Sequence, residues 1–240
     1  MLIPIGASRP LIRTPWVTMT IMGLNCLVHL VVSGSGIADQ FHIRFGYFGD
    51  YPSLLTLFTH MFLHADIFHL VGNLFFFAVP ALKMEDALGH FKFLLMYLAC
   101  GITAAMIQNF VDFGGPPLPM IGASGAIAGV MGAFMIMYPF SQVKIWFFFI
   151  VVFFLPAFAF FGFWFGKELL YLILSDRVGG VAFGAHVGGF FAGALWMYAF
   201  FGWDQGEDAD LAAIGEIAGR DQERKEPARA TEPAIEDPPS

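Results

Sequence analysis

Ser124 lies between two glycines at a point where a loop enters an apolar segment. It belongs to the run Gly-Ala-Ser-Gly-Ala at residues 122–126, which follows a glycine- and proline-rich stretch at residues 114–119. Glycine beside a serine leaves the hydroxyl uncovered and lets another backbone come close. Such a hydroxyl is a candidate nucleophile if a neighbouring base removes its proton. The same glycines are also typical of helix packing in membranes, and the run is not the Gly-x-Ser-x-Gly elbow of soluble hydrolases.

His186 lies inside the last apolar segment and is the candidate base. It belongs to the run Gly-Ala-His-Val-Gly-Gly, and an ionisable residue within a membrane span is a functional candidate by default. We expect this segment and the one that Ser124 opens to cross the membrane in the same direction. Ser124 and His186 then lie at a similar depth, because five residues of helix descend only about 8 Å. No aspartate or glutamate lies near His186 in the sequence, so we predict a Ser-His dyad rather than a triad; a histidine that only hydrogen-bonds a neighbouring helix is the alternative.

His69 and Asn73 are four residues apart and therefore share one face of the same predicted helix. Acyl transfer requires donors aimed at the carbonyl oxygen that becomes negative, and histidine and asparagine side chains can serve. Two alternatives are a metal site formed with His60 and His64, and a polar network that only supports the fold. The histidine spacing matches a helical metal motif only between His60 and His64, which we place in a loop. For these two histidines we favour a structural role.

The composition predicts that these residues are embedded in a membrane. The 240-residue chain is 58% hydrophobic and 13% charged, whereas soluble domains average about 45–50% apolar and about 25% charged residues. The net charge of −7 comes from residues 204–240, which hold 11 acidic and 4 basic residues. This tail has little apolar surface to bury, so we expect it to be disordered. No basic cluster suggests a nucleic-acid partner, and Cys26 and Cys100 form neither a disulfide framework nor a zinc spacing.

Six apolar segments approach the length of about 20 residues that a membrane-spanning helix needs. They comprise residues 16–33, 68–82, 91–110, 123–140, 156–175 and 181–203. We expect residues 143–155 to form an apolar connector near the interface, because Pro156 suits the first turn of the next helix. Most basic residues outside the tail gather on one predicted side: Arg9, Arg13, Lys83, Lys92 and Lys144. Since such an excess marks the cytoplasmic side, we predict an all-α bundle of six spans with both termini in the cytoplasm.

The separated motifs resemble the rhomboid protease family in order and spacing. The matching residues are Phe58, Thr59, His60, His64, His69, Asn73, Glu85, Gly89, residues 122–125 and residues 185–189. The resemblance covers roughly residues 14–203 and implies a rhomboid-like bundle of six transmembrane helices that uses no metal and no cofactor. It also implies structural roles for His64 and Glu85.

The resemblance further implies a role for each candidate residue. Ser124 would be the nucleophile and His186 its general base. Asn73, His69 and the Ser124 backbone amide would hold the oxyanion, and Gly122 would line the substrate-binding site. Some family members place a tyrosine against the histidine four residues after the serine, where this chain has alanine.

We therefore divide the chain into a cytoplasmic N-terminus at residues 1–13, a membrane domain at residues 14–203 and a cytoplasmic tail at residues 204–240. The predicted function is cleavage of peptide bonds in or near the transmembrane segments of other proteins in the cell (inner) membrane. A non-catalytic rhomboid-like binder of such segments and a small transporter are the alternatives. The presence of both Ser124 and His186 argues against the binder. Transporters often contain two related halves, and the sequence shows no internal repeat.

Overall fold

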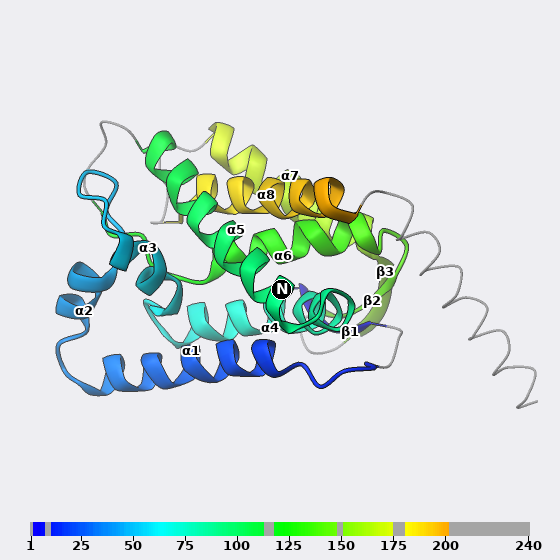
Figure 1. The fold of residues 1–240 in the computed structure, drawn as a ribbon, viewed down its shortest axis with the longest axis horizontal. Helices are drawn as coiled ribbons and strands as arrows, with labels where there is room; N and C mark the ends of the chain where they lie inside the picture. Colours follow the sequence, from blue (N-terminus) through cyan, green and yellow to red (C-terminus); the bar gives the residue numbers. More distant parts are fainter. Residues whose placement is uncertain (1, 8–10, 113–117, 148–150, 175–180, 202–240) are drawn as a thin grey trace, which may run out of the picture.

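The computed structural model describes residues 2–7, 11–112, 118–147, 151–174 and 181–201. Its helices are α1 (Trp16–Gly34), α2 (Ala38–Phe45), α3 (Leu54–Thr59), the 3-10 helix η1 (His60–Phe62), α4 (Ile67–Leu88), α5 (His90–Val111), α6 (Ser124–Met137), α7 (Ala157–Leu174) and α8 (Phe183–Phe201). Helix α6 lies in the middle of the bundle, where it packs against α4, α5, α7 and α8 (Figure 1). The structure is therefore mainly helical.

Each of the six predicted apolar segments overlaps one helix of this bundle: α1, α4, α5, α6, α7 or α8. Helices α1, α4, α5 and α7 are long and apolar enough to cross a membrane, whereas α6 has only 14 residues. The number of six crossings therefore stays a prediction. The predicted tail at residues 204–240 lies outside the described residues.

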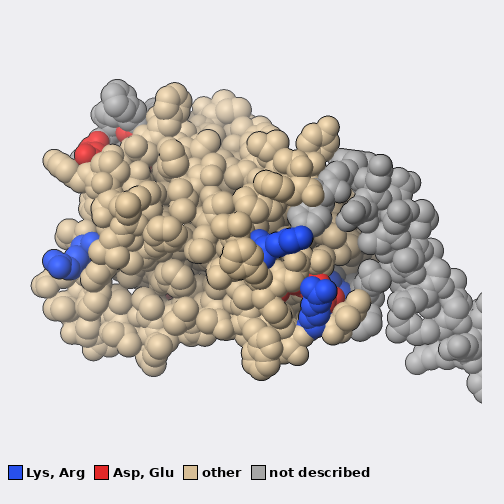
Figure 2. All heavy atoms as spheres, viewed as in Figure 1, with Lys and Arg blue, Asp and Glu red and all other residues tan. Residues whose placement is uncertain are grey.

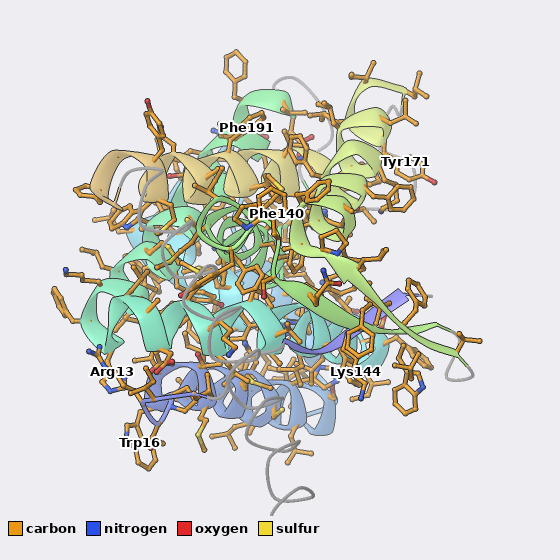
Figure 3. All side chains as sticks on the ribbon, turned by 90° about the vertical axis from the view of Figure 1, so that its right-hand side faces the viewer. Arg13, Trp16, Phe140, Lys144, Tyr171 and Phe191 are labelled. Atoms are coloured by element: carbon orange, nitrogen blue, oxygen red, sulfur yellow. The ribbon has the colours of Figure 1, made fainter. Side chains whose placement is uncertain are left out.

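A small antiparallel sheet at one end of the bundle corrects the all-α prediction (Figure 1). Its strands, in spatial order, are β1 (Leu2–Ala7), β2 (Gln142–Phe147) and β3 (Val151–Pro156). The described residues of the predicted connector at residues 143–155 thus lie in two paired strands, which extend away from the helices (Figure 3). Val143 and Ile145 are fully buried while Lys144 between them is partly exposed. This alternation is the period of a strand, and β-branched residues favour it.

Glu85 on α4 holds the first turn of α1. Its carboxylate accepts hydrogen bonds from the backbone N–H of Val17 at 2.8 Å and from the N–H and hydroxyl of Thr18 at 2.7 and 2.6 Å. His90 Nδ1 lies 2.6 Å from the same carboxylate. The first N–H groups of a helix have no partner within the helix, and the positive end of its dipole favours a negative charge. Glu85 therefore joins α1 to α4.

Glycines bring α6 and α8 into backbone contact. A methyl group added to Gly189 would collide with the carbonyl oxygen of Gly125, and one added to Gly193 would collide with the carbonyl oxygen of Gly129. In membranes, helix association depends on close packing because lipid offers the same apolar surroundings as another helix. The glycines thus allow the close approach of the two helices that carry Ser124 and His186.

We expect Gly193→Ala to lower thermal stability in detergent, because a backbone oxygen cannot rotate away from the added methyl group. Overpacking of this kind costs about 1–3 kcal/mol, and it should separate α6 from α8. Gly23→Ala on α1 is the control, since no atom lies within 4 Å of its added methyl group. Thermal unfolding of both variants checks this, and equal melting temperatures would contradict the tight α6–α8 contact.

Candidate catalytic site

Ser124 and His186 lie within hydrogen-bond distance of each other. Ser124 is the first residue of α6 and His186 lies in the first turn of α8, and Ser124 Oγ is 2.9 Å from His186 Nε2. The start of α8 is held on α5, because the Ala185 N–H donates to Gln108 Oε1 at 2.9 Å. The structure thus brings the two residues together, as the sequence predicted. Their catalytic roles stay a prediction.

Glu168 on α7 corrects the expectation that no carboxylate accompanies His186. Its Oε2 lies 2.7 Å from His186 Nδ1, and its Oε1 pairs with Lys167 Nζ. An ionised carboxylate can only accept hydrogen bonds, so His186 Nδ1 donates and Nε2 is left to accept from the Ser124 hydroxyl. The residue is 18 positions from His186 along the chain, which is why sequence proximity missed it. Its charge inside an apolar helix was the signal that could have identified it.

Aromatic rings hold the imidazole of His186 on its other sides. The Trp164 ring centroid lies 5.7 Å from that of His186, and the Phe183 ring stands perpendicular to it at 6.4 Å. Trp164 and Glu168 are four residues apart on α7, so one face of this helix supplies both contacts. Helix α7 therefore contacts the candidate base with both a carboxylate and an indole ring.

His69 and Asn73 lie beside Gly122, close to the first turn of α6. A methyl group added to Gly122 would lie 2.9 Å from His69 Nε2 and 3.8 Å from Asn73 Nδ2. Gly122 has a φ of +119°, a conformation that glycine adopts without steric cost. The Asn73 amide nitrogen is buried and has no hydrogen-bond partner among the described residues. The Ser124 N–H, as the first of α6, also lacks an intrahelical acceptor, so these donors are free to bind a ligand oxygen.

The residues that form this site fall within a segment that matches a known protein family. The rhomboid domain matches residues 51–203, more than half of the chain. The chain belongs to the rhomboid family. Together with the four helices of spanning length and hydropathy among the described residues, this makes it an integral membrane protein.

Several named rhomboid proteins are similar to this chain over part of their length. The human presenilin-associated rhomboid-like protein, mitochondrial, is 30% identical over 160 residues, which cover 62% of this chain and 37% of the human protein. Rhomboid protease GluP of Bacillus subtilis is 43% identical over 77 residues, 32% of this chain and 14% of GluP. RHOMBOID-like protein 6, mitochondrial, of Arabidopsis thaliana is 35% identical over 82 residues, which cover 32% of this chain and 24% of the Arabidopsis protein. The matched part of this rhomboid protein thus covers well under two thirds of the length of each of these relatives.

Two further histidines of the rhomboid motif are buried in the connection between α3 and α4. His60 Nδ1 lies 2.9 Å from the Thr56 carbonyl oxygen, and the His60 carbonyl accepts from the Gly122 N–H at 2.9 Å. Burial lowers the pKa of His60 to about 4, against the opposing effect of its backbone hydrogen bonds. Burial also lowers the pKa of His64 to about 4, with a further contribution from the nearby His69. The hydrogen bonds of His60 support a structural role, whereas His64 has no hydrogen bond from its ring nitrogens among the described residues and packs edge-on against the His69 ring, 5.1 Å between centroids.

The stability of this rhomboid protein should fall as the pH drops from 6.5 toward 4. His60 and His64 stay neutral in the folded state down to about pH 4, whereas their unfolded pKa is 6.5. The unfolded state therefore binds more protons in this window, and each histidine contributes a loss of up to about 1.4 kcal/mol per pH unit. Thermal unfolding in detergent at several pH values measures this slope. His60→Gln should make the slope shallower, and an unchanged slope would contradict the assignment.

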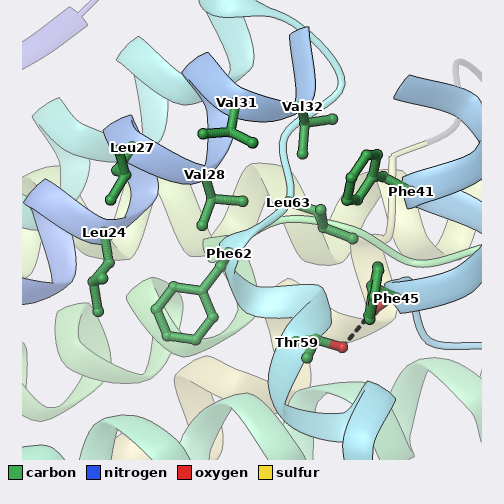
Figure 4. A pocket seen from close by; sticks show the side chains of 10 residues that line it. All are labelled: Leu24, Leu27, Val28, Val31, Val32, Phe41, Phe45, Thr59, Phe62 and Leu63. Carbon is green, nitrogen blue, oxygen red and sulfur yellow. Dashed lines mark hydrogen bonds between the residues drawn. The ribbon is translucent and has the colours of Figure 1, made fainter. Parts of the chain in front are cut away.

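An apolar cavity of about 480 Å³ lies between α1 and the first connection (Figure 4). Its walls include Val28, Phe41 and Phe62, and the Thr59 hydroxyl there donates to the Phe45 carbonyl oxygen at 2.7 Å. None of the lining residues belongs to the candidate site. The face of the molecule drawn in Figure 2 is largely uncharged, with charged side chains only in scattered places. Such a surface suits contact with lipid.

Proposed function

We propose that this rhomboid protein is an intramembrane serine endopeptidase. The observation that carries the proposal is the hydrogen bond between Ser124 Oγ and His186 Nε2 at 2.9 Å. The amide nitrogen of Asn73 beside Gly122, which has no hydrogen-bond partner in the described part of the chain, supports it, because a hydrolase needs donors for the oxyanion as well as a nucleophile and a base.

In the proposed reaction, Ser124 Oγ forms a bond to the carbonyl carbon of the scissile peptide and gives its proton to His186 Nε2. The carbonyl oxygen becomes negative and accepts hydrogen bonds from Asn73, His69 and the Ser124 N–H. The carbon–nitrogen bond then breaks, and His186 gives the proton to the leaving amine. Water attacks the acyl-enzyme, its proton passes to His186, and the Ser124 oxygen regains that proton as it leaves. Gly122 lines the space that the substrate backbone enters.

The substrates in this proposal are transmembrane or juxtamembrane segments of other membrane proteins. The candidate site belongs to helices that lie among spans rather than on a soluble domain, so a substrate reaches it within or at the edge of the bilayer. Lys144 on β2 and Arg13 both lie at the sheet end of the bundle (Figure 3), which we assign to the cytoplasm. We infer six crossings and a location in the cell (inner) membrane.

A fluorophosphonate probe tests the proposal, because it reacts with an activated serine and requires no knowledge of the natural substrate. The purified wild-type protein should be labelled, and Ser124→Ala should not. Co-expression with tagged single-span proteins should yield cleavage products that depend on Ser124. A wild type that neither reacts with the probe nor cleaves any of these proteins would refute the proposed activity, and cleavage that survives Ser124→Ala would refute the mechanism.

A further inference from the structure

Glu168 places a buried carboxylate inside an otherwise apolar helix. The residue is only 3% exposed, and α7 is one of the helices long and apolar enough to cross a membrane. A charge in such surroundings is costly unless it is paired and hydrogen-bonded. Both oxygens of Glu168 have a partner, since one lies against Lys167 Nζ and the other against His186 Nδ1. The carboxylate is therefore held in a fixed position by two partners.

Glu168 and Ser124 contact different ring nitrogens of His186. Nδ1 is 2.7 Å from Glu168 Oε2, while Nε2 is 2.9 Å from Ser124 Oγ. A carboxylate at Nδ1 fixes the tautomer in which Nε2 can accept a proton, and it stabilises the imidazolium that forms when the serine proton arrives. Apolar packing between α7 and α8 requires no charge here, because Phe165 already stacks on Phe190 with ring centroids 4.6 Å apart.

We propose that Glu168 is the positioning residue of His186, so that this rhomboid protein works with a Ser124–His186–Glu168 triad. The inference rests on the proposed function and deepens it. Glu168 stays ionised throughout: it accepts the Nδ1–H hydrogen bond, while the proton that moves is carried on Nε2. No covalent bond forms to Glu168.

Other titratable groups around His186 determine how a pH profile must be read. Lys167 reaches His186 only through Glu168, and it also lies over the Tyr171 ring, 5.4 Å from its centroid. His69 on α4 is close enough to act on His186 through its charge. Ser124 faces the ring from α6. Among these groups Glu168 is the one negative charge in direct contact with His186. Removal of this charge should therefore move the pH–activity profile in a single direction.

The test is the kinetics of Glu168→Gln on a tagged single-span substrate that the wild type cleaves in liposomes. Glutamine keeps the size and the acceptor oxygen but removes the charge. We expect kcat to fall roughly tenfold to hundredfold, the loss typical of a hydrogen bond to a charged group, with KM nearly unchanged. The acidic limb of the pH–activity profile should move to lower pH, because the protonated imidazole loses its negative partner. In Glu168→Asp, which keeps the charge, the limb should stay in place.

Glu85→Gln is the matched control, since Glu85 is also a buried, hydrogen-bonded glutamate, on α4, which has the length and hydropathy of a span. It should lose thermal stability, and its acidic limb should not move. Two results would overturn the triad while the proposed protease stands. One is a wild-type kcat in Glu168→Gln; the other is an unmoved acidic limb of its pH–activity profile together with a loss of stability like that of Glu85→Gln. If Glu168→Gln does not fold, Glu168→Asp decides: a fall in kcat at unchanged melting temperature supports positioning, and wild-type kcat overturns it. A wild type without Ser124-dependent cleavage would overturn both proposals.

Discussion

Ser124→Ala and His186→Ala should each abolish nearly all peptide-bond cleavage, and the double variant should be hardly slower than either single one. Residues that act as one unit in nucleophilic catalysis show this non-additivity; in subtilisin, loss of the serine or the histidine alone costs about 2 × 10⁶ in kcat, nearly as much as removing the whole triad. The 2.9 Å contact between the two side chains makes the same behaviour the expected result here. A double-mutant cycle tests this, in which the rates of cleavage in liposomes are measured for the wild type, the two single variants and the double variant.

A second serine–histidine contact in the same chain provides the control. On α1, Ser33 Oγ lies 3.3 Å from His29 Nε2, and neither residue is part of the candidate site. Ser33→Ala and His29→Ala should therefore keep the rate of cleavage within a few-fold of wild type. His29→Ala should lower thermal stability somewhat, because the removed imidazole is buried. If the Ser124 and His186 losses multiplied as independent effects, the two residues would not form one catalytic unit.

Asn73→Ala should lower turnover strongly while it leaves thermal stability almost unchanged. Removing one oxyanion donor from a serine hydrolase costs about 10²–10³ in kcat, or roughly 2.7–4 kcal/mol. A hydrogen bond that only packs two membrane helices contributes about 0.6 kcal/mol on average, and its loss affects folding. The buried Asn73 amide nitrogen has no partner among the described residues, so its removal breaks no packing hydrogen bond there. The oxyanion role therefore predicts a loss of rate without a loss of stability.

Three other variants separate oxyanion binding from packing. His69→Ala should also lower turnover, with some loss of stability because the imidazole leaves a cavity. His64→Ala should lose stability and activity in parallel. Asn25→Ala on α1, where Asn25 is buried outside the candidate site, should reduce stability without a specific loss of kcat. Cleavage by Asn73→Ala within a few-fold of wild type would remove Asn73 from the catalytic site and make it a helix-packing residue.

Much of the helical architecture and of the candidate site could be predicted from the sequence. Runs of about 20 apolar residues predict helices in lipid, where every backbone polar group must find a partner within the segment, and each predicted run does overlap a helix. The pairing of Ser124 with His186 followed from their depths in two helices of the same direction and from glycines that permit close approach. His69 and Asn73 were placed on one helix face by their spacing.

The tertiary structure alone decided which groups from other segments meet these residues. Strand β2 pairs on one side with β3 and on the other with β1, a partner more than 130 positions away along the chain, and a strand is stable only when its hydrogen bonds are made by neighbours. Glu168 reaches His186 because α7 packs on α8, and the sequence indicates neither which helices are neighbours nor how each is rotated about its axis. Composition and periodicity act along the chain, whereas the hydrogen bond at His186 Nδ1 depends on the contact between two helices.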